Sequence, residues 1–159
     1  MTLLYLISSL SSSYAHPNRN PPVSGVALGI TTGPMFNSST RGTVFSFTGG
    51  CYTDIPLLDT FYFTPSTTIY RYRSWLDLDL SLSFKFVVPV EKIRFMGGIS
   101  AGLTSSETLL PHVGVFGGAS FHFMNNLDWF INTNYLHQFD QPTTHSIAIT
   151  TGPLFRFYN

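Results

Sequence analysis

Residues 76–90 read Leu-Asp-Leu-Asp-Leu-Ser-Leu-Ser-Phe-Lys-Phe-Val-Val-Pro-Val, and every even position among them is large and apolar. The odd positions from 77 to 85 are charged or hydroxylated. Successive side chains of a strand point to opposite faces, so this pattern predicts one β-strand with an apolar and a polar face. A tilted strand of about 9–11 residues crosses the hydrocarbon core of a bilayer. We therefore expect the apolar face to meet lipid through Leu76, Leu78, Leu80, Leu82, Phe84 and Phe86.

The composition is poor in the residues that cover a soluble protein. The 159 residues are 43% hydrophobic and 16% aromatic but only 10% charged, whereas soluble domains carry about 25% charged residues. The 8 basic and 8 acidic residues cancel, so no charge excess points to nucleic acid. The only cysteine, Cys51, excludes an internal disulfide and a CxxC motif. The length fits a single domain.

The first fifteen residues have the features of a secretory signal peptide with a truncated basic region. Residues 3–7 form a short apolar core, and Ser13-Tyr14-Ala15 has the small-x-small pattern of a cleavage site. We expect residues 16–24 to be a linker and residues 25–159 to form the folded domain. Because no Lys or Arg precedes Arg19, the alternative is that this segment is not a working signal. No apolar run reaches the ~18 residues of a transmembrane helix.

From residue 25 onward, short alternating segments separated by turn residues predict an all-β fold, a closed antiparallel up-and-down transmembrane β-barrel. Helical periodicity is absent. Pro56 and Pro65 interrupt segment 54–68, so we expect the third strand to be short or bulged. Trp75 has the parity of the polar face and requires a bulge to point outward. The eight strands are expected at 25–36, 42–53, 58–64, 68–88, 92–103, 111–124, 127–138 and 145–158.

The expected connections are short. Turns at 89–92 and 124–127 fall on the same side as the chain ends, and the opposite side carries loops of about six to eight residues. Segment 65–74, with Arg71 and Arg73, could project and bind a partner or lipid phosphates. Aromatic residues near strand ends are expected to form two interfacial girdles: Tyr70, Tyr72, Phe121, Phe123, Trp129, Tyr135, Phe157 and Tyr158.

The polar faces indicate a narrow interior rather than a surface in water. They are mostly Ser, Thr, Gly and Asn, with few charges of mixed sign. Such charges must be paired when they are buried, and an eight-stranded barrel is just wide enough for side chains to fill. We expect the lumen to be plugged by a charge network that ties strands four, five and eight together: Asp77, Asp79, Lys85, Arg94 and Arg156. The alternative is a soluble, lipocalin-like ligand-binding barrel.

Two sequence patterns involve the last strand. Residues 30–36 (Ile-Thr-Thr-Gly-Pro-Met-Phe) recur at 149–155 as Ile-Thr-Thr-Gly-Pro-Leu-Phe, either as a matched kink at the closing seam or by chance. Thr150, Gly152, Phe155 and Phe157 form a polar-x-Gly-x-x-aromatic-x-aromatic pattern that resembles the C-terminal assembly signal of outer-membrane proteins.

From Gly25 to Asn159 the pattern resembles the small eight-stranded outer-membrane barrels typified by OmpX and the OmpA barrel domain. The resemblance implies the bacterial outer membrane and insertion by the barrel-assembly machinery. We expect outer-membrane lipid as the partner of the apolar face, and a monomer. It does not select one activity.

Serine and histidine residues on the polar faces are candidates for a catalytic site. Ser120-x-His122 places a hydroxyl and an imidazole on one polar face, without an evident carboxylate to orient the histidine. At the other rim a second set could cluster: His112, His137, His145, Asp140, Ser105 and Ser106. Scattered histidines are more often interfacial polar residues than a catalytic triad or a metal site. We expect a structural, non-enzymatic protein without a cofactor; the alternative is an outer-membrane lipid A acyl hydrolase or transferase.

Overall fold

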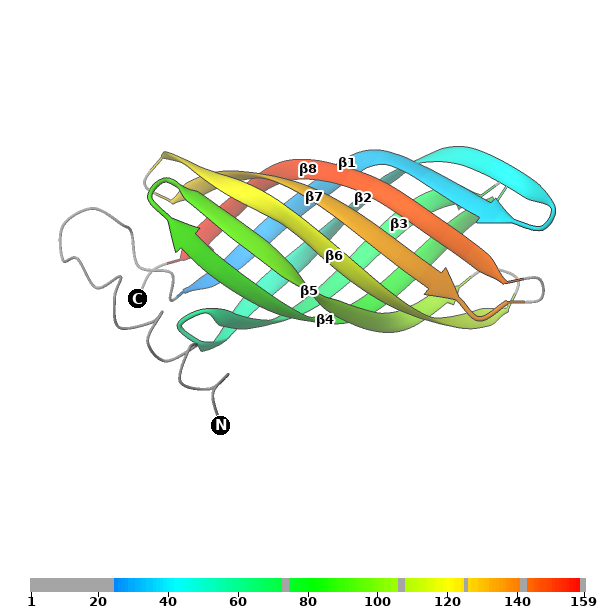
Figure 1. Ribbon diagram of the computed structural model, residues 1–159, viewed down its shortest axis with the longest axis horizontal. Helices are drawn as coiled ribbons and strands as arrows, with labels where there is room; N and C mark the ends of the chain where they lie inside the picture. Colours follow the sequence, from blue (N-terminus) through cyan, green and yellow to red (C-terminus); the bar gives the residue numbers. More distant parts are fainter. Residues whose placement is uncertain (1–24, 73–74, 106–107, 125, 141–142, 158–159) are drawn as a thin grey trace.

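The computed structural model describes residues 25–72, 75–105, 108–124, 126–140 and 143–157. Eight strands form a closed antiparallel barrel in which each pairs with its sequence neighbours and β8 pairs with β1 (Figure 1). The strands are β1 (Val26–Ser39), β2 (Gly42–Leu58), β3 (Phe61–Tyr72), β4 (Trp75–Val90), β5 (Ile93–Ser105), β6 (Leu109–Met124), β7 (Leu127–Gln138) and β8 (Thr144–Phe157). The predicted fold class is confirmed. In the described residues, no helix is long and apolar enough to span a membrane.

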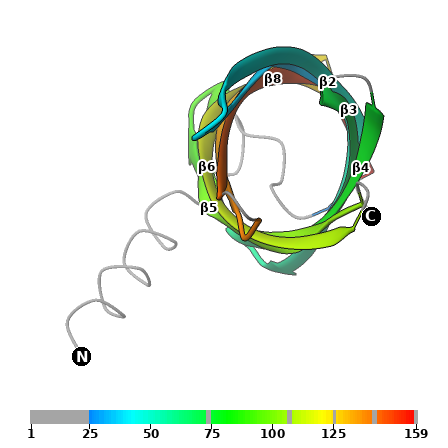
Figure 2. The same ribbon diagram turned by 90° about the vertical axis from the view of Figure 1, so that its right-hand side faces the viewer.

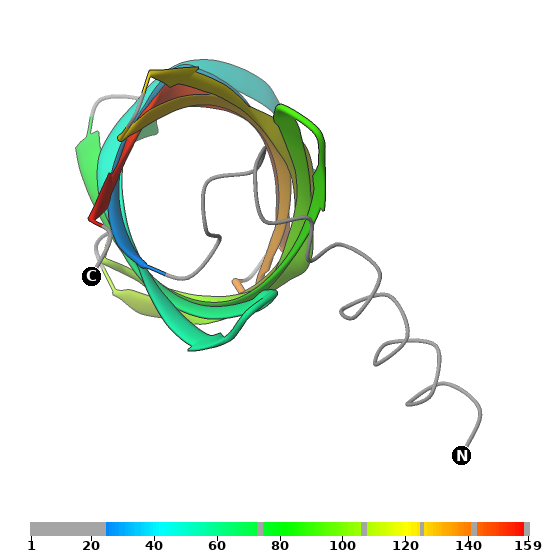
Figure 3. The same cartoon turned by 90° about the vertical axis from the view of Figure 1, so that its left-hand side faces the viewer.

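The barrel has two rims. Viewed along its axis, the strands form a closed ring (Figures 2 and 3). Val26 of β1 pairs with Phe157 of β8 at the end we call the terminal rim. The hairpins β1–β2, β3–β4, β5–β6 and β7–β8 turn at the opposite end, the far rim. A residue's place along its strand therefore gives its height between the rims.

Side chains alternate between the lumen and the outer surface. On β4, Leu76, Leu80 and Leu82 are 75%, 52% and 56% exposed on the outside. Asp77 and Asp79, between these leucines, are each 4% exposed. The outer positions Leu78, Phe84 and Phe86 follow the same alternation. The period-two pattern thus sorts a polar lumen from an apolar exterior.

The boundary between the third and fourth strands lies later in the sequence than predicted. Residues 68–72 belong to the end of β3, not to strand four, and β3 runs without interruption through Pro65. Proline lacks the N–H of a ladder bond. Pro65 is tolerated because the β2–β3 bridges pass from Tyr52↔Ser66 to Ile55↔Phe63 and leave its position unbridged. The irregularity in this pair lies instead between Pro56 and Leu58.

The turns are tighter than expected. The far-rim connections comprise only residues 40–41, 73–74, 106–108 and 139–143, because the strands extend further than predicted. The β3–β4 register is unbroken up to Tyr72↔Trp75, so the bulge that would turn Trp75 outward is not present in this pairing. The side chains of Tyr72 and Trp75, and Arg73 and Tyr158 altogether, lie outside the described part.

Two apolar clusters pack inside the barrel between the polar side chains. One, nearer the terminal rim, contains Tyr62, Phe130 and Leu154. The other contains Met35, Tyr70 and Ala148. Tyr70 is only 3% exposed, so its expected place in an interfacial girdle is wrong: it points into the lumen. Trp129 and Phe123, in contrast, are exposed on the outer surface.

Candidate functional site

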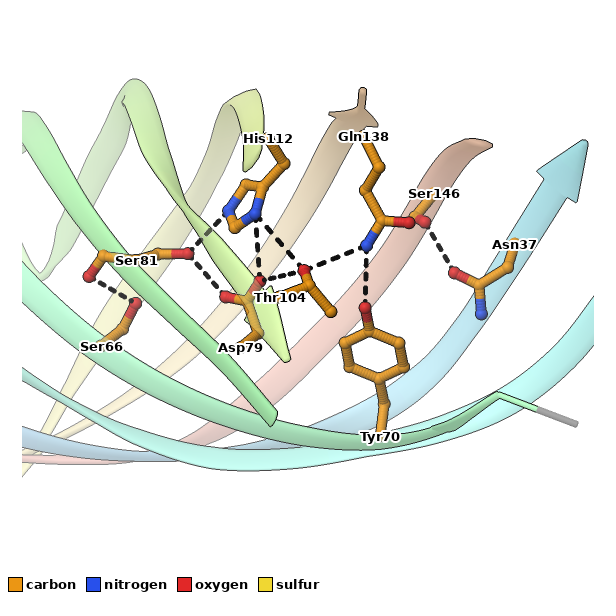
Figure 4. Close-up of polar contacts among 9 residues, drawn as sticks. All are labelled: Asn37, Ser66, Tyr70, Asp79, Ser81, Thr104, His112, Gln138 and Ser146. Atoms are coloured by element: carbon orange, nitrogen blue, oxygen red, sulfur yellow. Dashed lines mark hydrogen bonds and ion pairs between the residues drawn. The ribbon is translucent and has the colours of Figure 1, made fainter. Parts of the chain in front are cut away.

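Polar side chains form a layer across the lumen on the far-rim side in two hydrogen-bonded groups, and Asp79 of β4 lies in the middle of the larger group. Ser81 Oγ donates to Asp79 Oδ1 at 2.6 Å, and Thr104 Oγ1 donates to Asp79 Oδ2 at 3.0 Å. The His112 ring spans the same group, with Nδ1 3.3 Å from Asp79 Oδ2 and Nε2 3.0 Å from Ser81 Oγ (Figure 4). The carboxylate is therefore satisfied by hydroxyls and an imidazole.

The layer continues to the other strands. Gln138 Nε2 of β7 donates to Thr104 Oγ1 at 3.1 Å and to Tyr70 OH of β3 at 2.8 Å (Figure 4). On the opposite wall, Ser146 Oγ of β8 donates to Asn37 Oδ1 of β1 at 2.6 Å. Asn37 Nδ2 in turn donates to Ser46 Oγ of β2 at 3.3 Å. Every strand thus contributes a buried side chain to this far-rim layer.

A second layer lies toward the terminal rim and contains the buried ion pairs. Asp128 of β7 accepts from Arg94 Nη1 of β5, from Arg156 Nε of β8 at 2.6 Å, and from His122 Nδ1 of β6 at 2.9 Å. These contacts make Asp128, which is 0% exposed, the centre of three positively charged or polar donors. We call this group, with the Lys85–Asp54 pair described next, the terminal-rim layer.

Lys85 of β4 forms the other buried pair of this layer. Its Nζ donates to Asp54 Oδ2 of β2, and Thr64 Oγ1 of β3 donates to Asp54 Oδ1 at 2.8 Å. Lys85 Nζ also lies 5.0 Å from the centroid of the Tyr52 ring, within cation–π range. Hydrogen-bonded pairing of this kind is what allows ions to persist in a dry interior.

A cavity of about 130 Å³ separates the two layers. Its walls carry many hydroxyls and amides, among them Thr31, Thr48 and Asn132. Thr31 Oγ1, Thr48 Oγ1 and Asn132 Oδ1 are buried there without a hydrogen-bond partner in the protein. Buried polar atoms are normally satisfied, and this volume exceeds the ~10–15 Å³ that one water needs. The cavity is therefore suited to several ordered waters.

Charge is unevenly distributed along the lumen. Three basic side chains, Lys85, Arg94 and Arg156, gather near the terminal rim, with Asp54 and Asp128 as their acidic partners. The far-rim half holds Asp77 and Asp79. The five residues expected in a lumenal network are all buried inside. The ion pairs of the three basic residues use partners that were not predicted: Lys85 joins β4 to β2 through Asp54, and Arg94 and Arg156 join β5 and β8 to β7 through Asp128.

The Ser120–His122 pair does not form. Ser120 Oγ is buried without a hydrogen-bond partner, whereas His122 is hydrogen-bonded to Asp128. Asp128 is therefore the carboxylate that orients His122, a partner that was not evident from the sequence. Asp128 is also shared with Arg94 and Arg156. The arrangement pairs charges and supplies no nucleophile–base contact.

The histidines expected to meet at the other rim fall into two separate places. His112 is inside the barrel and 2% exposed. His137 and His145 lie outside, where their Nδ1 atoms are 3.3 Å apart. Ser105 is exposed at the end of β5, and Ser106 lies outside the described residues. Within the described residues, no group of three or more His, Cys, Asp or Glu side chains could hold a metal ion.

The residues of the predicted assembly signal lie on both faces of β8. Phe155 and Phe157 are 42% and 53% exposed on the outer surface near the terminal rim. Thr150 and Gly152 point toward the lumen. A Cβ on Gly152 would lie 1.9 Å from the carbonyl oxygen of Ile30, so close packing against β1 explains the glycine of this pattern.

Solved structures with the same architecture identify the fold. Neisserial surface protein A aligns with a TM-score of 0.74 and 15% identity, covering 84% of this chain and 98% of that one. The chain has the fold of the small outer-membrane β-barrels. Pseudomonas aeruginosa OprG aligns with a TM-score of 0.53, 8% identity and coverages of 86% and 97%. The N-terminal barrel domain of P. aeruginosa OprF aligns with a TM-score of 0.52 and 11% identity, covering 81% of this chain and 97% of that one.

The sequence comparisons add no family to this fold. No protein-family model matches the chain, and no curated protein matches it significantly. Identities of 8–15% establish architecture alone, and one fold hosts many activities. The features specific to this chain are the two lumenal layers and the outer surface.

Proposed function

We propose that this protein is a small, monomeric, integral β-barrel of the bacterial outer membrane, with a structural or surface-interaction role and no enzymatic activity. The observation that carries the proposal is the inversion of its faces: the outside is apolar and the inside polar. Monomeric soluble proteins rarely expose apolar patches above a few hundred Å². Hydrocarbon removes that cost, and a closed barrel leaves no strand edge unpaired within it.

The apolar surface extends around the whole circumference. Each strand contributes large exposed side chains between its ends: Ile30, Phe47, Ile69, Leu82, Ile99, Val115, Ile131 and Ile149 are examples from β1 to β8 in order. A ligand-carrying soluble barrel would need the opposite distribution, with its apolar residues lining the lumen. The outer surface therefore supports lipid as the partner and disfavours the lipocalin-like alternative.

The lumen of the proposed protein is closed. The far-rim and terminal-rim layers lie in series, and a solute would have to break hydrogen bonds or ion pairs in both to pass. Wide aqueous channels use roughly sixteen or more strands. We therefore propose a plugged barrel that does not produce the stepwise current increases of an open pore in a bilayer.

Membrane residence can be tested on the full chain. We expect it to fractionate with outer membranes, to need detergent for dispersion, and to migrate faster on a gel before boiling than after. Planar-bilayer recording should show no reproducible nanosiemens steps. A protein that stays monodisperse in plain buffer would refute membrane residence, and regular conductance steps would refute the plug.

One observation favours a second candidate, a hydrolase. Ser81, His112 and Asp79 have the contacts of a nucleophile, a base and an orienting carboxylate. However, Ser81 Oγ also donates directly to Asp79 at 2.6 Å, and all three lie inside the barrel, away from the lipid-facing surface.

A fluorophosphonate probe separates the two candidates. The structural proposal expects no labelling of Ser81 in the native chain and an unchanged lipid A profile in a deletion strain. Labelling that disappears in Ser81→Ala and in His112→Ala would establish the hydrolase instead. Ser83→Ala, which changes a neighbouring lumenal serine outside the Asp79–His112 group, is the matched control.

A further inference from the structure

On the outside of the barrel, at the far-rim end of the β7–β8 pair, three nitrogen and oxygen atoms converge. His137 and His145 are directly opposite in the register. Their Nδ1 atoms are 3.3 Å apart, and Tyr135 OH lies 2.7 Å from His145 Nδ1. None of these groups takes part in the lumenal layers. Imidazole nitrogen is the commonest protein ligand of borderline transition-metal ions.

The separation of the two nitrogens is the separation that a shared metal ion requires. Zinc binds histidine nitrogen at about 2.0–2.1 Å with tetrahedral geometry, which places two ligand nitrogens about 3.3–3.4 Å apart. The two Nδ1 atoms are already at 3.3 Å. An ion about 1.2 Å off the line joining them could contact both nitrogens without moving either strand.

Hydrogen bonds alone do not give each of these three atoms a partner of its own. Each ring nitrogen offers either one N–H or one lone pair. His145 Nδ1 nevertheless faces both Tyr135 OH and His137 Nδ1, so one atom must serve two partners in either tautomer. A bound cation would use both imidazole lone pairs at once and leave the phenol oxygen as a further ligand or a partner of bound water.

Neighbouring rings hold the two imidazoles in place. The Phe139 ring meets His137 edge-on with centroids 4.9 Å apart. The Tyr135 ring stacks on His145 with centroids 6.0 Å apart and planes inclined at 23°. Ligands whose orientation is fixed before binding lose less entropy when the ion arrives.

We propose that His137 and His145, with Tyr135 beside them, form a surface site for a divalent transition-metal ion of the Zn²⁺ or Cu²⁺ class. Two protein nitrogens leave coordination positions open to water or to an external ligand. Nitrogen ligands discriminate against Ca²⁺ and Mg²⁺, which prefer oxygen. The site lies on the outer surface and is independent of whether the lumen conducts.

The test uses the untagged full chain in detergent, titrated with Zn²⁺ by calorimetry and with Cu²⁺ by electron paramagnetic resonance. We expect one ion per chain, with a copper spectrum showing two nitrogen ligands. Either His137→Ala or His145→Ala should weaken binding by more than tenfold, and Tyr135→Phe by less. The double variant His112→Gln/His122→Asn should retain the site, because both of these histidines are lumenal.

Gel mobility before and after boiling checks that each variant is folded, and the exposed position of His145 makes loss of the fold unexpected. Equal binding in the native chain and in both single histidine variants would overturn the proposal. So would the absence of binding at millimolar Zn²⁺ and Cu²⁺, or a copper spectrum without two nitrogens.

Discussion

Thr32 of β1 lies directly opposite Thr151 of β8 at the seam that closes the barrel. Each threonine is the third residue of an Ile-Thr-Thr-Gly-Pro copy, so residues 30–34 and 149–153 run antiparallel past each other. The contacts are symmetric: a Cβ on Gly33 would lie 1.9 Å from the Ile149 carbonyl oxygen, as one on Gly152 would from that of Ile30. The two copies thus form one matched close approach between the first and last strands.

The prolines of the repeat occupy compatible positions. The β1–β8 bridges pass from Gly29↔Leu154 to Thr32↔Thr151 and then to Met35↔Ala148. Pro34 and Pro153 fall in the intervals between these pairs, where no ladder N–H is required of them. The repeat is therefore explained by barrel closure.

Gly152→Ala should destabilise the barrel. The added methyl group would meet backbone rather than a flexible side chain, so β1 and β8 must separate. We expect the free energy of unfolding to fall by at least ~1–3 kcal/mol, as for an overpacked core. Urea titration in detergent, followed by gel mobility, measures the loss.

Gly49→Ala is the matched control for the seam. Gly49 pairs with Thr32 on the outer face, and the nearest atom to an added Cβ there is the Thr31 carbonyl oxygen at 3.8 Å. This variant should be as stable as the native protein or slightly more stable. Equal stability of Gly152→Ala and Gly49→Ala would show that close packing at the seam is unimportant.

Asp128→Asn should be among the most damaging lumenal substitutions. The change removes the negative charge that Arg94 and Arg156 share and leaves two buried cations without this partner. Breaking a buried pair in this way costs about 3–5 kcal/mol. Tryptophan fluorescence during urea unfolding provides the measurement, because Trp129 is next in sequence.

Asp59→Asn provides the comparison for Asp128→Asn. Asp59 is exposed in the β2–β3 turn, and a surface substitution of this kind usually changes stability by no more than ~0.5 kcal/mol. If Asp128→Asn proved as mild as Asp59→Asn, the terminal-rim layer would not be a significant source of stability.

The alternation on β4 is sufficient to predict which side chains face outward, because side-chain direction in a strand is a local property. Parity also distinguishes the histidines. His112 shares the inward face of Gly114, and His137 the outward face of Tyr135. Parity applied consistently along both strands therefore separates His112 from His137 on the amino-acid pattern alone.

Other features depend on information that a single sequence lacks. Asp54 and Lys85 are 31 residues apart, and Arg94 and Asp128 are 34 apart. Their pairing depends on the stagger of neighbouring strands around the barrel, which alternation does not specify. The expectation that the third strand ends before Pro65 was wrong, because whether a strand tolerates proline depends on its bridges to the neighbouring strand.

Leu82→Arg tests whether the outer surface lies in hydrocarbon. Leu82 is near the middle of β4 and 56% exposed. Arginine at the bilayer midplane costs about 2–4 kcal/mol in a barrel, whereas near an interface the cost falls to about 0–1 kcal/mol. We expect Leu76→Arg, close to the far rim on the same face, to be much milder. The comparison requires refolding in lipid vesicles, and equal effects would contradict a membrane-spanning β4.

Phe155→Ala separates assembly from stability. Phe155 is exposed on the outer surface, so its loss removes little internal packing. If the terminal pattern is read by the assembly machinery, the variant should accumulate less in outer membranes of cells yet refold normally in detergent. Phe47→Ala, an exposed aromatic on β2, should assemble like the native chain. A detergent refolding defect as large as the cellular defect would indicate packing instead.

The two lumenal layers predict that conductance appears only when both are opened. Arg94→Ala with Arg156→Ala removes two side chains from the terminal-rim layer, while the far-rim layer stays intact. His112→Ala with Gln138→Ala removes two side chains from the far-rim layer, together with the His112–Ser81 and Gln138–Tyr70 hydrogen bonds. Each double variant should remain closed in planar bilayers, and the quadruple variant should conduct, because both layers have then lost side chains that fill the lumen. Conductance in either double variant alone would show that a single layer closes the lumen.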